Sequence, residues 1–254
     1  MRDVLDFHLD DLVPADADSE YVEQRLWSGD LTVLAEHHTT ANGYVVAHDG
    51  SVTWGVPGRP QVSAIKIARD PSLNTFTLET SYHATVSFAQ SWLIEHGCPP
   101  GRIARVGDGF MKPADNLTVR VEQQIRESGS RYEVLDTQTW DFDPCETWTL
   151  TRDSHTDQAP IRVFLEEGDR EAHTYTMREG AFADEVTARR WLDDRSTPLP
   201  CPPEYRVEAT GLRTRAALAR SPGASAIPKA GLDTRALQAP SAGAAPRPDS
   251  GRSM

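Results

Sequence analysis

Apolar residues recur along the chain with two different periods, and the order of these periods repeats. Residues 75–80 are apolar at every second position, a pattern typical of a half-buried strand. Residues 84–96 then carry large apolar side chains at helical spacing, which predicts an amphipathic helix. The members of this stripe are Phe88, Ala89, Trp92 and Leu93. A strand followed by a helix is therefore predicted. Gly97 suits the end of this helix, where the backbone often adopts a left-handed conformation.

The same succession recurs ninety-nine residues later. Residues 75–93 align without a gap on residues 174–192, and six of nineteen positions are identical. Cys-Pro-Pro follows each helix, at 98–100 and at 201–203. We interpret the pattern as two related modules in tandem. The competing interpretation is that any strand followed by an amphipathic helix resembles any other such pair.

Further elements are predicted on both sides of these segments. Ser19 is expected to cap a helix over 19–27, and Asp49-Gly50 to form a tight hairpin turn. Pro113 fits the first turn of a helix over 113–128, and Asp184 is expected to cap a helix over 184–195. Strands are predicted over 31–36, 43–48, 52–54, 62–68 and 75–80, and again over 132–139, 147–151, 161–166 and 173–178.

Helices that follow runs of hairpins indicate an α+β fold rather than a doubly wound parallel sheet. We expect two similar modules in tandem, each an antiparallel sheet with a helix on one face. After Ala209 the chain has almost no large apolar residues, so burial cannot offset the entropy of ordering and a disordered tail is predicted. The predicted divisions are an acidic N-terminal lead-in, a first module, a linking helix, a second module and the tail, over 1–30, 31–111, 112–130, 131–208 and 209–254.

The chain has a net charge of −12, and the charge is unevenly distributed. Residues 131–197 contain sixteen acidic and eight basic residues, whereas residues 198–254 contain four and eight. An acidic body repels the phosphates of nucleic acids, so the composition argues against a nucleic-acid partner.

Cysteine usage and hydropathy bear on the cellular compartment. Cys98, Cys145 and Cys201 are widely spaced without a Cys-x-x-Cys pair, so neither a disulfide framework nor a thiolate zinc site is expected. We expect Cys98 and Cys201 to be packing residues. The N-terminus lacks the apolar core of a signal peptide, and no apolar run approaches the ~18–20 residues that span a bilayer. We therefore expect a cytoplasmic protein without a membrane segment, a metal or a cofactor.

The common catalytic motifs for phosphate loops, dinucleotide sites, zinc peptidases and serine hydrolases are absent from the sequence. Scattered residues can still form a site, because imidazoles from neighbouring strands and carboxylates of an acidic turn can transfer protons. The competing interpretation is that these histidines lie on the surface and that the turn is solvated. The catalytic candidates are Glu36, His37, His83, Asp141 and Asp143.

The tryptophans are candidates for binding. Trp54 and Trp140 lie near predicted strand ends, where exposed aromatic side chains can anchor a partner. Trp92 and Trp191 lie on apolar helix faces and are expected in the core.

Three hypotheses for the function follow. The first is a non-enzymatic binding or regulatory protein that recognises another protein through its tandem modules. The second is a hydrolase or nucleotide-processing enzyme that uses His and Asp residues between the modules. The third is a nucleic-acid-binding protein, with an acidic mimic of DNA as a variant of the first. The sequence leaves the oligomeric state, and whether the chain catalyses any reaction, open.

Overall fold

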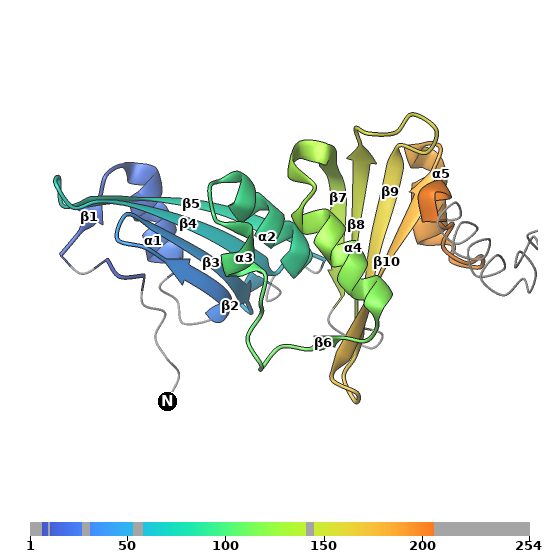
Figure 1. Ribbon diagram of the computed structural model, residues 1–254, viewed down its shortest axis with the longest axis horizontal. Coiled ribbons are helices and arrows are strands. Elements are labelled where there is room, and N and C mark those ends of the chain that lie inside the picture. Colours follow the sequence, from blue (N-terminus) through green and yellow to red (C-terminus); the bar gives the residue numbers. More distant parts are fainter. Residues whose placement is uncertain (1–6, 10, 27–30, 53–57, 141–144, 206–254) are drawn as a thin grey trace, which may run out of the picture. The chain divides into compact units, whose positions relative to one another are not determined.

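The computed structural model describes residues 7–9, 11–26, 31–52, 58–140 and 145–205. Two five-stranded sheets follow one another along this part of the chain (Figure 1). The predicted α+β class, with two sheet-plus-helix modules in tandem, is confirmed. The predicted disordered tail lies outside the described residues.

The first sheet has the strand order β1-β5-β4-β3-β2. Its four long strands form the predicted antiparallel meander, but the two-residue β1 runs parallel to β5, so the sheet is mixed. Helix α1 packs on one face, and helices α2 and α3 pack on the other. The elements are β1 Val13–Pro14, α1 Ala17–Leu26, β2 Leu31–His38, β3 Asn42–Asp49, β4 Val62–Asp70, β5 Thr75–His83, α2 Val86–Glu95 and α3 Pro100–Ile103.

The second sheet repeats this plan in the order β6-β10-β9-β8-β7. The short β6 runs parallel to β10, α4 lies across one face and α5 packs on the other (Figure 1). The elements are β6 Lys112–Pro113, α4 Asn116–Arg126, the 3-10 turn η2 Gly129–Arg131, β7 Tyr132–Trp140, β8 Cys145–Asp153, β9 Ile161–Asp169, β10 Thr174–Phe182 and α5 Glu185–Asp193.

Details of the backbone agree between the two modules, which supports their interpretation as a duplication. β1 meets β5 with Val13 opposite Thr75, and β6 meets β10 with Lys112 opposite Thr174, each residue ninety-nine positions after its counterpart. A bulge interrupts β2 after Val33, and another interrupts β7 after Val134. Chance resemblance of one strand and one helix would not reproduce these irregular features.

A buried hydroxyl performs the same task in each module. Asp16 caps α1 by accepting the Ser19 N–H at 2.7 Å, so Ser19 is not the cap that the sequence predicted. The Ser19 hydroxyl instead accepts a hydrogen bond from the Leu78 N–H on β5 at 3.1 Å. In the second module, the Thr118 hydroxyl accepts the N–H of Met177 at 3.1 Å. Since β1 and β6 are only two residues long, each hydroxyl continues the edge of the sheet beyond the short strand.

Apolar side chains on both faces of the first sheet are covered. Consecutive residues Val45, Val46 and Ala47 of β3 are all fully buried, although they point alternately to opposite faces. Val45 and Ala47 pack in a cluster with Leu26 of α1, whereas Val46 packs in a cluster with Leu93 of α2. Each sheet therefore requires a helix on both sides, one more than the sequence analysis predicted.

Trp92 and Trp191 lie in corresponding surroundings. Trp92 stacks on His96 with ring centroids 3.8 Å apart, and the guanidinium of Arg195 lies 5.4 Å from the ring of Trp191. His96 and Arg195 are again ninety-nine positions apart. The two helices differ in their outer faces, because Phe88 of α2 packs on Phe164 of β9, whereas the outer face of α5 is polar. Trp191 lies in the core of the second module, as predicted. Trp92, also predicted in the core, is only half-buried against the core of the first module.

Several predicted boundaries change in the structure. The predicted Asp49-Gly50 hairpin is wrong, because β3 pairs with β2 on one side and with β4 on the other. Of the strand predicted over 52–54, the last two residues lie outside the described part of the chain. Pro113 lies in β6, and α4 begins at Asn116 with Asp115 as its cap. Gly97, at a φ of 100°, and Asp184, which accepts the Thr187 N–H at 2.8 Å, are the helix ends that the sequence predicted.

The segments predicted as a lead-in and as a linking helix also supply elements to the sheets. β1 and α1 come from residues 1–30, and both contact β5. β6 and α4 come from residues 112–130, and both contact β10. Each module thus begins with a short parallel strand and a helix that covers the first face of its sheet.

We predict that the two buried hydroxyls stabilise the fold to a similar extent. Ser19→Ala and Thr118→Val each leave a strand N–H without its acceptor, so each should lower the free energy of unfolding by about 1–3 kcal/mol. Urea denaturation of the purified chain measures both values. Thr187→Val is the control, because Thr187 occupies the same turn of α5 but is exposed; its effect should stay within about 0.5 kcal/mol. Equal effects of Thr118→Val and Thr187→Val would contradict this role.

Candidate binding site

The predicted catalytic residues of the first sheet do not converge. Glu36 and His37 lie on β2, and His83 lies at the end of β5, with β3 and β4 between them. Three strand spacings amount to about 14 Å. His83 is also in the same row across the sheet as Thr32, so it is further displaced along the strands from Glu36. Asp141 and Asp143 lie outside the described residues.

The two histidines have packing roles in this arrangement. The ring of His37 stacks on Tyr44 with centroids 6.3 Å apart, and His83 lies 6.4 Å from the ring of Trp92. Burial lowers the pKa of His83 to about 4, so its imidazole is neutral at neutral pH. Among the described candidates, no hydrogen bond or ion pair joins His37 or His83 to another, as proton transfer would require.

Of the two binding candidates, Trp54 lies outside the described residues and Trp140 lies at a surface hollow. Trp140 ends β7 and is 44% exposed. It borders a cavity of about 330 Å³, which adjoins a second one of about 470 Å³. Both cavities lie between strands β7 and β8 and helix α5, and they share the side chains of Trp148 and Leu192. Gly58, whose carbonyl accepts the Thr139 N–H at 3.2 Å, also lines the larger cavity. We call this region the β7–α5 groove; its principal residues are Asp136, Trp140, Trp148, Arg189, Leu192 and Arg195.

The corresponding region of the first module is filled by the chain itself. Ala35 follows the β2 bulge as Asp136 follows the β7 bulge, and Tyr44 pairs with His37 as Trp148 pairs with Gln138. Leu93 precedes Leu192 by ninety-nine positions. In the first module, Ala35, Tyr44 and Leu93 are buried in one cluster with Ile103, the last residue of α3. The groove is therefore the place in the second module that α3 occupies in the first.

Charged side chains surround the apolar floor of the groove. Arg189 donates to Asp136 at 2.6 Å and to Glu185 at 2.9 Å. Arg195 pairs with Glu146, which also lines the groove. Because these pairs are partly exposed, each contributes little to stability. They hold two guanidinium groups at the rim of the groove.

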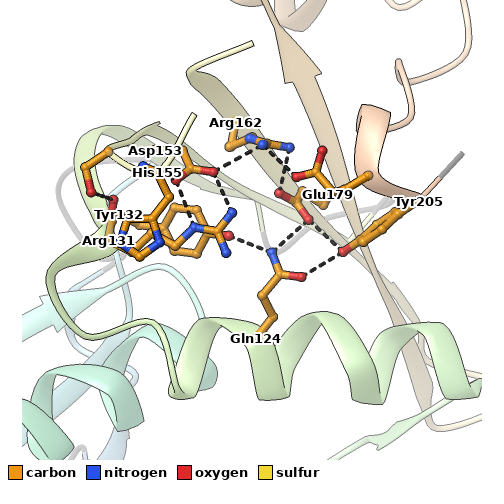
Figure 2. A network of polar contacts seen from close by, with 10 residues as sticks. Gln124, Arg131, Tyr132, Asp153, His155, Arg162, Glu179 and Tyr205 are labelled. Carbon is orange, nitrogen blue, oxygen red and sulfur yellow. Dashed lines mark hydrogen bonds and ion pairs between the residues drawn. The ribbon is translucent and has the colours of Figure 1, made fainter. Parts of the chain in front are cut away.

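A separate polar network lies on the opposite face of the second sheet (Figure 2). Arg162 of β9 is 1% exposed and pairs with Asp153 at 3.1 Å, Glu179 at 3.2 Å and Glu204 at 2.7 Å. Arg131 donates two further bonds to Asp153, at 2.8 and 2.6 Å. Its central residues Asp153, Arg162 and Glu179 are buried, whereas Glu204 reaches solvent, and this arrangement indicates a structural role.

The same network attaches the last described turn to the sheet. In Figure 2, Gln124 reaches up from α4 and Tyr205 reaches in from the C-terminal turn. The Tyr205 hydroxyl donates to Glu179 at 2.7 Å, and the Gln124 amide donates to the same carboxylate at 3.0 Å. Burial raises the pKa of Glu179, although the contacts with Tyr205 and Arg162 oppose this shift. Burial raises the pKa of Asp153, but the hydrogen bonds from Arg131 and from the His155 N–H, with the charges of Arg131 and Arg162, together outweigh it, and the pKa of Asp153 is lowered.

A metal site, a membrane segment or a disulfide would each require a particular arrangement of residues. No three His, Cys, Asp or Glu side chains there are grouped to hold a metal ion, and none of its helices is long and apolar enough to cross a membrane. The three cysteines are unpaired. Cys98 is a packing residue as predicted, and burial raises its pKa to about 11, whereas Cys201 is exposed and the prediction for it is wrong.

Comparison with family models, with curated proteins and with solved structures gives no match for this chain. The site must therefore be interpreted from its own residues.

Sequence reasoning identified Trp140 in the groove but missed Trp148, Leu192 and Arg189. Trp148 and Leu192 look like ordinary core residues, because each lies on the apolar side of a regular pattern. A comparison of the two modules residue by residue contains a signal for this groove. Charged Asp136 and Arg189 occupy the positions of Ala35 and Gln90, both buried in the first module, and such a change indicates a face that has lost its cover.

We predict that Arg162→Leu destabilises the chain by about 3–5 kcal/mol, because it removes the cation paired with the buried Glu179 carboxylate and leaves the buried Asp153 with Arg131 alone. The control Arg152→Leu removes an exposed arginine paired with Glu133 at 3.2 Å and should change stability by no more than about 1 kcal/mol.

The pH dependence distinguishes this mechanism from a simple packing defect. Without Arg162, the folded-state pKa of Glu179 rises further above its unfolded value, so stability is lost as pH increases through that folded pKa. The deficit of Arg162→Leu should therefore be largest at neutral pH and shrink in mildly acidic buffer. A deficit that does not change with pH in urea titrations would contradict the role of the ion pairs.

Proposed function

We propose that this chain is a non-enzymatic binding protein that recognises another protein through the β7–α5 groove. The observation that carries the proposal is the difference between the modules: α3 covers this surface in the first module, whereas the described residues leave a groove at the same place in the second. The first module buries this apolar surface in its own core. Exposure of the equivalent surface to water in the second module is unfavourable, so binding of a partner there would be favoured.

The residues of the groove suit a protein ligand. Trp140 and Trp148 are large and rigid side chains, of the kind that dominates the energy of protein interfaces. Arg189 and Arg195 at the rim add directional donors for carbonyl or carboxylate oxygens. Cavities of about 330 and 470 Å³ are within the range of about 300–1,000 Å³ that is usual for ligand-binding pockets.

The charge of this part of the chain favours the same proposal over a nucleic-acid partner. Residues 131–197, which include the groove, carry sixteen acidic and eight basic residues, a balance that repels phosphate backbones. Among the described candidates for catalysis, Glu36 and His37 lie on β2 and His83 lies on β5, with two strands between them, so they lend no support to an enzyme.

We predict that Trp140→Ala reduces recovery of a protein partner from an extract of the source cells. The purified partner should then bind Trp140→Ala about 30-fold more weakly than the unaltered chain, as for an aromatic anchor worth about 2 kcal/mol. Calorimetry or surface binding measures the ratio. Because Trp140 is 44% exposed, its replacement should leave the thermal unfolding temperature nearly unchanged.

Tyr21→Ala is the matched control, since Tyr21 is an exposed aromatic residue on α1, 59% accessible and outside the groove. It should leave partner recovery unchanged. If Trp140→Ala recovers every protein that the unaltered chain recovers, the β7–α5 groove is not a protein-binding site and the proposal is wrong.

A further inference from the structure

We infer that the β7–α5 groove takes a helical turn of the partner that ends in a large aliphatic residue, in the way that the first module holds its own α3. This inference rests on the proposed function and specifies the ligand. In the first module, α3 and the residues after it fill the equivalent surface through three separate contacts.

The first contact is the apolar anchor. Ile103, at the end of α3, is fully buried against Ala35, Tyr44 and Leu93. The counterparts of these three residues line the groove of the second module. Asp136 replaces Ala35, but Trp148 and Leu192 keep the floor apolar, so an aliphatic side chain similar in size to Ile103 should pack on them.

The second contact is a hydrogen bond to the end of the turn. The Gln90 amide of α2 donates to the carbonyl of Ile103 at 2.7 Å. Arg189 stands ninety-nine positions later on α5 and lines the groove. A guanidinium group at this point can donate to the final carbonyls of a helical turn, where the backbone dipole favours a positive charge.

The third contact lies at the strand bulge. The Gly107 N–H donates to the carbonyl of Leu34, the bulge residue of β2, at 2.8 Å. Leu135 is the bulge residue of β7, and no later segment in the described part of the chain donates to its carbonyl. A partner residue four positions after the aliphatic anchor would lie where Gly107 lies in the first module.

Together these contacts define a ligand pattern. Ile103 is followed three positions later by Val106, which also packs on the cluster. The expected partner segment therefore has a large aliphatic residue at the end of a helical turn, an apolar residue three positions further on, and an available backbone N–H directly after it. No particular charge is required on its outer side.

The probe for this inference is a displayed library of short random peptides, selected on the immobilised full chain. Selected peptides should share two apolar residues three positions apart, the first of them Ile, Leu or Met. In two-dimensional NMR spectra, each peptide should shift the indole N–H signal of Trp148 and leave that of Trp92 unchanged. Exchanging the first apolar residue for Asp should abolish the shift.

Substitutions at Arg189 then separate a specific contact from general packing. Arg189→Ala should weaken peptide binding about tenfold, as for the loss of a charged hydrogen bond. Arg189→Gln restores the donor that the first module has and should cost less than about threefold. Arg190→Ala, on the exposed neighbour, should have no effect.

The outcomes distinguish this inference from the proposed function. Peptides that shift Trp148 but lack the apolar pair, or bind as extended strands, would overturn the inference and leave protein recognition intact. Equal binding by Arg189→Ala and Arg189→Gln would overturn the proposed contact. If no selected peptide shifts Trp148, the inference is wrong, whereas the recovery of a groove-dependent partner from cell extract tests the function independently.

Discussion

The structure depends on covering both faces of each five-stranded sheet. The central strands carry apolar residues at consecutive positions, so one face cannot be left in water without a large free-energy cost. Each module meets this requirement with a helix before its long strands and another helix after them. The short parallel strands β1 and β6 and the hydroxyls of Ser19 and Thr118 then fix the first helix to the edge of its sheet.

The two modules meet the same requirement with different residues. In the first module, α1 packs against an apolar face that includes Ile65 and Ile67. In the second, the face under α4 buries Arg162 with several carboxylates, so charge pairing replaces part of the apolar contact. Buried ion pairs add less to stability than well-packed apolar groups, but they require one arrangement of their partners. This network is what holds the C-terminal turn at Tyr205 in place.

The modules also differ in how completely the second face is covered. α2 is buried along both sides, and α3 extends its cover across β2. α5 is apolar on one side only, and the chain after it runs to β10, where Pro200 accepts the Ala181 N–H at 2.9 Å. No described segment covers strands β7 and β8 in the way that α3 covers β2, and the groove lies there. Two copies of a duplicated unit can thus share the same arrangement of strands and helices, while one copy exposes a surface that the other copy buries.

The periodicity of the sequence was sufficient for the α+β class, the tandem modules and all eight long strands, because strand and helix patterns depend on residues close in the chain. It also identified the helix ends at Gly97 and Asp184, where local backbone chemistry decides. The strands β1 and β6 could not be predicted, since two residues carry no period, and Pro113 was assigned to a helix for that reason.

Only the tertiary structure decided which surfaces stay open. Trp148 and Leu192 have the same local pattern as buried residues, and whether they are covered depends on where the chain after α5 runs. The separation of Glu36 from His83 was likewise a matter of strand order, which sequence spacing does not encode. Local pattern determined the elements of this protein, whereas long-range packing determined which of its faces meet water.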